Sequence, residues 1–185
     1  LIDVNGTLYG TTDLGGSSDK GTVYSTSPSG QEVVLHSFGG PSDGAHPYAG
    51  LTEVNGMLYG TTYGGGSSGN GTVFSISPSG VEKVVHSFKG SDGAHPEAAL
   101  IDVKGTLYGT TFEGGSSNRG TIYSMTPSGA VTVLHNFGAV SDGALPLGRL
   151  INVNGTLYGT TYGGGKAPGV CQDGSGCGTV YAWTP

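Results

Sequence analysis

The chain has 185 residues, which is enough for one domain, with 7 Lys and Arg, 13 Asp and Glu, and a formal net charge of −6. Neutralising phosphates needs clustered basic residues, and the few here are scattered, so we expect no nucleic-acid or anionic-membrane partner. No apolar run approaches the ~20 residues of a membrane-spanning helix.

The dominant pattern is a tandem repeat with a period of about 50 residues. The stretch Gly6–Thr12 returns with little change as Gly56–Thr62, Gly105–Thr111 and Gly155–Thr161. We treat residues 1–185 as one domain of four repeats: 1–49, 50–98, 99–148 and 149–185. Gly (38) and Pro (9) are frequent, but they recur between runs rich in Val, Leu, Tyr and Thr, so they are read as turns between strands.

The second repeat shows the elements of one unit most completely. The sequence predicts strands over residues 50–54, 57–63, 71–77 and 81–88. Asn55-Gly56 predicts a two-residue hairpin because both positions of that turn need positive φ. Residues 64–70 are expected to form a loop, and Pro78-Ser79-Gly80 a turn. The density of glycine argues against helices.

Four short antiparallel strands per repeat are typical of a propeller blade. We therefore predict an all-β fold, a β-propeller of four ~50-residue, four-stranded blades. The last repeat stops after its third strand, at residues 178–185, so its blade lacks a fourth strand. Three arrangements remain open: a closed four-bladed ring with a short last blade, half of a larger ring completed by a second chain, and a fragment of a longer array. An unpaired third strand would be an edge that invites pairing with another chain.

Two features of the strands predict tight packing between blades. In the fourth strand, Val34, His36 and Phe38 are expected on one face and Leu35 on the other, and the later repeats share this pattern. A mid-strand glycine indicates that another backbone passes close by. Such glycines occur in every repeat, at Gly10, Gly60, Gly109 and Gly159.

Together these motifs resemble a known repeat family. They are Gly-Thr-Leu-Tyr-Gly-Thr-Thr, Gly-Gly-Gly-Ser-Ser, Gly-Thr-Val-(Tyr/Phe), Pro-Ser-Gly, Val-Leu-His-Ser-Phe and Ser-Asp-Gly-Ala-His-Pro. The set resembles the GloVer-type tandem repeat of bacterial secreted or surface-anchored "choice-of-anchor" proteins, over essentially the whole chain. The unit is also similar to a kelch blade in strand order and length. The resemblance implies a β-propeller and a secreted or cell-surface location, and it carries no activity.

The crossovers between repeats hold the first candidate site. Its residues are Asp43, His46, Asp92, His95 and Asp142. They could form a ring of carboxylates and imidazoles at one mouth of the propeller, able to hold a metal or a polar ligand. The interpretation that we favour is turn chemistry, in which Asp caps its own turn and Pro stiffens entry to the next blade. The third copy has Leu145 in place of His, so we predict no metal site.

Other side chains also have two interpretations. Tyr63, Phe112 and Tyr162, beside the Gly-rich loops, could stack on sugars or could cap blade ends. The strand histidines are expected to pack between blades, with one ring nitrogen bonded to backbone, rather than to bind a ligand; they are His36, His86 and His135. The polar residues of the first strands could line a channel or simply be solvated; they are Asp3, Glu53, Asp102 and Asn152.

Two patterns suggest covalent modification. Cys171 and Cys177, the only cysteines, are predicted to form a local disulfide in an oxidising compartment; free thiols are the alternative, and a zinc site lacks a second pair of ligands. Asn5, Asn70 and Asn154 match the N-glycosylation pattern, but the interpretation that we favour is that Asn-Gly is simply the hairpin turn and Thr the first strand residue.

No spacing suggests a nucleophile beside a base, so we predict no catalytic residue and no cofactor. The sequence favours an extracellular structural or interaction module that associates with itself or with other chains through its incomplete blade. A carbohydrate-binding propeller is the second hypothesis. An enzyme acting on polysaccharide is the third, by analogy with other propellers alone.

Overall fold

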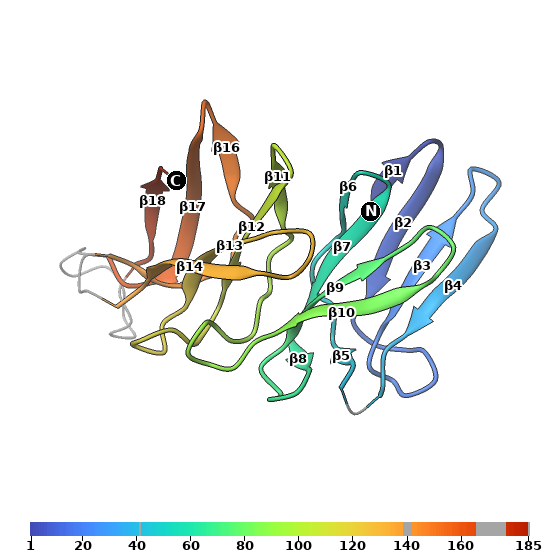
Figure 1. The fold of residues 1–185 in the computed structure, drawn as a ribbon, viewed down its shortest axis with the longest axis horizontal. Helices are drawn as coiled ribbons and strands as arrows, with labels where there is room; N and C mark the ends of the chain where they lie inside the picture. Colours follow the sequence, from blue (N-terminus) through green and yellow to red (C-terminus); the bar gives the residue numbers. More distant parts are fainter. Residues whose placement is uncertain (41, 139–141, 166–176, 185) are drawn as a thin grey trace.

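A computed structural model of the chain describes residues 1–40, 42–138, 142–165 and 177–184 (Figure 1). These residues form strands and turns, with no helix among them, which confirms the all-β class. Four antiparallel four-stranded sheets, one for each repeat, lie side by side in chain order and do not close into a ring within the described residues (Figure 1).

Each of the first three sheets pairs its four strands in chain order. Sheet 1 consists of β1 (Ile2–Val4), β2 (Thr7–Thr12), β3 (Thr22–Thr26) and β4 (Glu32–Ser37). Sheet 2 consists of β6 (Thr52–Val54), β7 (Met57–Thr62), β9 (Thr72–Ile76) and β10 (Glu82–Ser87). Sheet 3 consists of β11 (Ile101–Val103), β12 (Thr106–Thr111), β13 (Thr121–Met125) and β14 (Val131–Asn136).

Sheet 4 has a different edge. It consists of β16 (Ile151–Val153), β17 (Thr156–Gly163), β18 (Thr179–Trp183) and β15 (Ala144–Pro146), and β15 pairs with the end of β17. No described strand pairs with the outer side of β18. Within the described residues, β18 is therefore an open edge of sheet 4.

The predicted hairpin turns are present. Asn55 and Gly56 have φ values of 52° and 81°, and Val54 pairs with Met57 across the turn. The side chain two residues before each turn accepts a hydrogen bond from the glycine N–H of that turn; the pairs are Asp3–Gly6, Glu53–Gly56, Asp102–Gly105 and Asn152–Gly155. These polar side chains thus stabilise their own turns, as solvated strand residues rather than as a shared site.

A β-bulge in each fourth strand overturns the predicted faces of that strand. In sheet 1, Val34 pairs with Tyr24 and His36 pairs with Val23, so Leu35 is the extra residue. Neighbouring residues of β3 point to opposite faces, so Val34 and His36 also lie on opposite faces. The same shift recurs in β10 and β14. The expectation that the valine and histidine share a face was wrong, because apolar alternation does not reveal a bulge.

The core consists of three clusters, one between each pair of consecutive sheets. We call the face of each sheet that looks toward the next repeat its forward face, and the opposite one its back face. Between sheets 1 and 2, Tyr9 and Val23 on the forward face pack against Leu58 and Phe74 on the back face. Both inner sheets are therefore covered on both sides by their neighbours, as a repeat fold requires.

The mid-strand glycines make room for an aromatic ring, not for another backbone as predicted. Gly60 pairs directly with Phe74, and a Cβ on Gly60 would lie 2.7 Å from Cε1 of that ring. The other repeats place Tyr24, Tyr123 and Tyr181 over Gly10, Gly109 and Gly159. The ring lies across its own sheet, so each glycine is needed for packing within a repeat.

The crossovers pair with the following repeat, which the sequence did not predict. β5 (Gly44–Ala45) pairs with β8 (Gly64–Gly65), in a stretch expected to be a loop. Ala94 bridges to Glu113 in the same way, and β15 pairs with β17. Each crossover thus adds backbone hydrogen bonds to the apolar contacts that join one sheet to the next.

Candidate functional sites at the junctions between sheets

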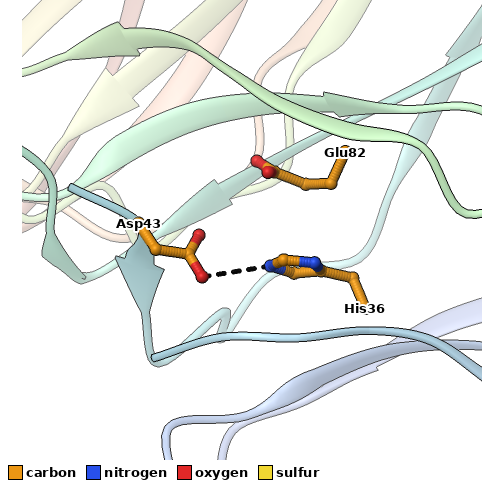
Figure 2. A group of neighbouring side chains, drawn as sticks. All are labelled: His36, Asp43 and Glu82. Atoms are coloured by element: carbon orange, nitrogen blue, oxygen red, sulfur yellow. Dashed lines mark hydrogen bonds and ion pairs between the residues drawn. The ribbon is translucent and has the colours of Figure 1, made fainter. Parts of the chain in front are cut away.

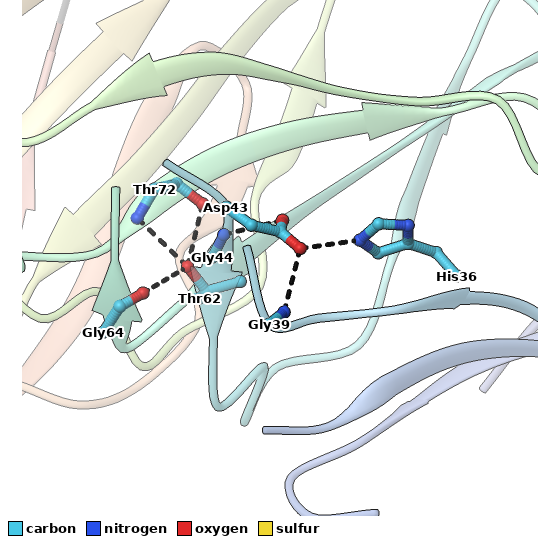
Figure 3. Close-up of polar contacts among 7 residues, drawn as sticks. All are labelled: His36, Gly39, Asp43, Gly44, Thr62, Gly64 and Thr72. Carbon is cyan, nitrogen blue, oxygen red and sulfur yellow. Dashed lines mark hydrogen bonds and ion pairs between the residues drawn. The ribbon is translucent and has the colours of Figure 1, made fainter. Parts of the chain in front are cut away.

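Each strand histidine binds an aspartate of the crossover that follows it. His36 Nε2 lies 3.1 Å from Asp43 Oδ2, and the same pair recurs as His86–Asp92 at 2.9 Å and His135–Asp142 at 3.0 Å. Asp43 also accepts hydrogen bonds from the N–H groups of Gly39 (3.0 Å) and Gly44 (2.8 Å), as Figure 3 shows. The carboxylate therefore both caps its turn and holds the imidazole.

Tight packing fixes the position of this carboxylate. Thr62 Oγ1 accepts a hydrogen bond from the N–H of Thr72 and donates to the carbonyl of Gly64 (Figure 3). Gly44 lies directly on the Thr62 side chain, so a Cβ at this position would overlap Thr62. Glycine follows the aspartate because only a residue without a side chain fits there.

The imidazole connects the carboxylate to the aromatic core. The ring of His36 meets the ring of Phe38 edge-on at 4.8 Å, and Phe38 meets Phe74 of the next sheet at 5.1 Å. The second and third junctions have the same arrangement. The predicted packing role of these histidines fits this geometry, but the ring nitrogen bonds a carboxylate where a backbone partner was expected.

The first junction has a third polar side chain, which sequence reasoning missed. Glu82 on β10 pairs with Ile76, so it lies on the back face of sheet 2, and Figure 2 shows its carboxylate turned toward His36 and Asp43. Burial raises the pKa of Glu82 to about 7; the nearby Asp43 charge also raises it and His36 lowers it. In sheet 3 the corresponding residue is Val131, paired with Met125. Nothing in the sequence marks this residue, because the exposed Glu32 has the same position in the first repeat.

The crossover histidines lie in a different cluster from the aspartates. His46, Tyr48, Tyr63 and His95 form a row with successive ring-centroid distances of 6.4, 5.4 and 4.4 Å. The last pair is stacked, with 22° between the ring planes. His46 Nδ1 lies 3.0 Å from Asp13 Oδ1, and His95 Nδ1 donates to the carbonyl of Tyr63 at 2.9 Å. We call these four rings the aromatic row. The structure therefore separates Asp43 and Asp92 from His46 and His95.

The backbone at the crossover histidines is left-handed. His46 and His95 have φ values of 60° and 54°, and Leu145 in the third crossover has 59°. Non-glycine residues rarely adopt this conformation. Because leucine adopts it as well, the turn itself does not require an imidazole. The two histidines thus add polar, titratable groups that the fold does not need.

The remaining candidate residues lie apart from this row. Phe112 is half-buried and Tyr162 is exposed, at the positions that correspond to Tyr63. Asn5 and Asn154 are exposed turn residues, and the carbonyl of the half-buried Asn70 accepts a hydrogen bond from His95 N–H. Their binding and glycosylation roles stay predictions. Cys171 lies outside the described residues, so the Cys171–Cys177 disulfide also stays a prediction.

The repeat motifs identify the family. The Gloeobacter/Verrucomicrobia repeat matches residues 1–181. The chain belongs to this family. No curated protein sequence matches this member of the Gloeobacter/Verrucomicrobia repeat family. No helix in the described part of the chain is long and apolar enough to cross a membrane.

One solved structure shares the fold of this repeat protein, and two others match it more weakly. A luciferin-regenerating enzyme superposes with a TM-score of 0.57 at 18% identity, over 97% of this chain and 58% of that one. The GH43B protein of the Bacteroides ovatus xyloglucan PUL (TM-score 0.47, 18% identity) matches 85% of this chain and 34% of its own length. A proposed 6-phosphogluconolactonase from Bacteroides uniformis (TM-score 0.48, 14% identity) matches 75% of this chain and 40% of its own length. At 18% identity, the similarity to the luciferin-regenerating enzyme concerns the fold alone. The present chain spans little more than half the length of that enzyme.

Proposed function

We propose that this chain is a secreted or cell-surface structural module, an arc of β-propeller blades whose two end faces join to further blades. A second copy of the chain is the partner to which we commit. The proposal of a propeller rests on four consecutive sheets packed forward face to back face. The location rests on the resemblance to secreted repeat proteins and on the predicted disulfide.

One observation carries the proposal: the end faces expose residues that are buried at every internal junction. Val180 on the forward face of sheet 4 is 73% exposed, whereas the corresponding Ile122 in sheet 3 is 1% exposed. At the other end, Leu1 is 70% exposed, whereas the corresponding Leu51 in sheet 2 is 2% exposed. Covering one such side chain contributes about 1.5–3 kcal/mol.

The two end faces also complement each other. Sheet 4 presents a forward face with Ile151, Tyr158 and Val180, and sheet 1 presents a back face with Leu8 and Tyr24. Forward face against back face is the arrangement of all three internal junctions. The partner's sheet 1 would therefore continue the stack, and the open side of β18 would be available for a strand of that partner.

Sedimentation velocity over a range of concentrations tests this proposal. We expect the chain to associate, and we expect Val180→Asp to sediment as a single chain of 18.4 kDa. Ser67→Asp, in an exposed loop of the inner sheet 2, adds the same charge on a sheet that has no end face and should associate normally. A wild-type chain that stays single at every concentration would contradict the proposal.

Carbohydrate binding is the second candidate, and the aromatic row favours it. Tyr48 is half exposed and Tyr63 partly so, and both are flanked by imidazoles, so the row offers flat apolar rings beside hydrogen-bonding groups. A glycan array probed with the wild-type chain and with Tyr48→Ala would test it. Binding that survives Tyr48→Ala would place the glycan elsewhere.

A further inference from the structure

The first junction holds three ligating side chains that come from two different sheets. His36 belongs to β4, Asp43 to the crossover and Glu82 to β10. One ligand atom from each lies within 4.8 Å of the other two (Figure 2). Among the described residues, this is the one such group of histidine and carboxylate side chains.

Two of the three groups are already held in place. Asp43 accepts hydrogen bonds from two backbone N–H groups, and His36 is held against the ring of Phe38. The His36 and Asp43 side chains are 22% and 13% exposed, so the site is largely covered and partly open to solvent. Outer contacts of this kind orient the ligands in natural metal sites.

Glu82 is the group that the fold leaves unexplained. Its Oε1 atom is shielded from solvent and has no hydrogen-bond partner. Leaving a buried carboxylate oxygen unpaired is costly. The second junction shows that packing does not require a carboxylate here, because Val131 takes the corresponding position beside His86 and Asp92.

We propose that His36, Asp43 and Glu82 bind one divalent transition-metal ion, of which Zn²⁺ is the type, and that the ion ties the first repeat to the second. One imidazole nitrogen with two carboxylate oxygens is a ligand set that suits Zn²⁺ better than Ca²⁺ or Mg²⁺. A solvent molecule would complete a tetrahedral site from the open side. This departs from the sequence-based expectation of no metal, because Glu82 comes from a different repeat.

Binding requires small local changes. Zn–N and Zn–O bonds of about 2.1 Å place neighbouring ligand atoms roughly 3.4 Å apart, so the Glu82 side chain must move closer. Coordination replaces the hydrogen bond between His36 Nε2 and Asp43 Oδ2, so the imidazole keeps its proton on Nδ1. Glu82 and Asp43 bind as carboxylates, and any proton on Glu82 passes to solvent.

Titration of the tag-free, EDTA-treated chain with ZnCl₂ tests the proposal. Isothermal titration calorimetry should show one ion per chain, and Zn²⁺ should raise the melting temperature. Glu82→Gln keeps the shape of the side chain and should weaken Zn²⁺ binding at least ~10-fold. His95→Ala removes an imidazole of the same 22% exposure as His36 that lies outside the site, and it should leave binding unchanged. Wild-type binding weaker than about 1 mM, or equal binding by Glu82→Gln, would overturn the proposal.

A gain of binding offers an independent test within the same chain. Val131→Glu should create the missing third ligand beside His86 and Asp92, so this variant should bind two ions instead of one. Visible absorption of Co²⁺ then reports whether the new site has the same tetrahedral spectrum as the first. A folded Val131→Glu variant that still binds one ion would contradict the three-ligand geometry.

Discussion

Replacing Gly60 by alanine tests whether an aromatic ring explains the mid-strand glycine. A methyl group at this position would lie 2.7 Å from Cε1 of Phe74 and 2.9 Å from Cδ2 of Leu51. Phe74 and Leu51 are both buried between sheets 1 and 2 and cannot move aside. Overpacking of this kind costs about 1–3 kcal/mol. Alanine instead of glycine in a strand returns about 0.5–1 kcal/mol, so the net loss should be roughly 0–2.5 kcal/mol.

The cause can be isolated with a second substitution. Phe74→Leu shortens the side chain that covers Gly60, so in this background Gly60→Ala should no longer destabilise and should raise the free energy of unfolding by up to about 1 kcal/mol. Gly10→Ala is the matched control in sheet 1. There the methyl meets Leu1, which is exposed and free to move, and Tyr24, which is only half-buried, so its cost should be smaller.

Urea unfolding followed by circular dichroism measures the free energy of unfolding of the wild type, of the two single variants and of the double variant. We expect a coupling energy of at least about 1 kcal/mol between positions 60 and 74. Additive effects of Gly60→Ala and Phe74→Leu would refute the role that we assign to the ring.

Three further predictions concern single groups. In the metal-free chain the pKa of Glu82 is about 7 against an ordinary 4.5, so the free energy of unfolding should fall as pH rises through this interval. Glu82→Gln should make that fall about 1 kcal/mol smaller. The effect is less than the full pKa difference implies, because solvent screens part of the Glu82 charge. Tyr123→Phe should stabilise by about 1 kcal/mol, because the Tyr123 hydroxyl is buried without a partner and Phe74 fills the same position in sheet 2. Asn55→Ala should cost about 1 kcal/mol, because Asn55 has a φ of 52°.

Urea unfolding also measures the free energy of unfolding of these three variants. A different result would contradict each prediction. For Glu82, the fall between pH 4.5 and 7 should be about 1 kcal/mol smaller in the variant, and an equally steep decline would exclude this group as a source of the fall. For Tyr123, a loss of stability would mean that the hydroxyl has a partner. Asn55→Gly is the control for Asn55→Ala, since glycine accepts positive φ; equal losses for both would point to a role of the asparagine side chain.

Local signals predicted the strands of each repeat well. Asn55-Gly56 fixed one hairpin, and the runs from Met57 and from Gly71 became β7 and β9. These features depend on residues that are neighbours in sequence, so turn chemistry and alternation are sufficient to predict them.

Features that depend on distant residues could not be predicted. The bulge at Leu35 turns His36 toward the next sheet, and the sequence shows only an unbroken apolar run there. The pairing of His36 with Asp43 depends on how the crossover folds back. Glu82 joins them only because two repeats stack. In the sequence, Glu82 has the same position in its repeat as Glu32, which is an ordinary exposed strand residue.

Native-state hydrogen exchange of the single-chain form, which Val180→Asp should provide, tests the central claim most directly, because it measures the stability of each sheet separately. If each sheet is stabilised by the neighbours that cover its faces, amides of β7, β9, β12 and β13 should exchange slowest. Amides of β2, β3, β17 and β18, whose sheets have one open face, should exchange faster. Equal protection of all four sheets in the single chain would contradict the account.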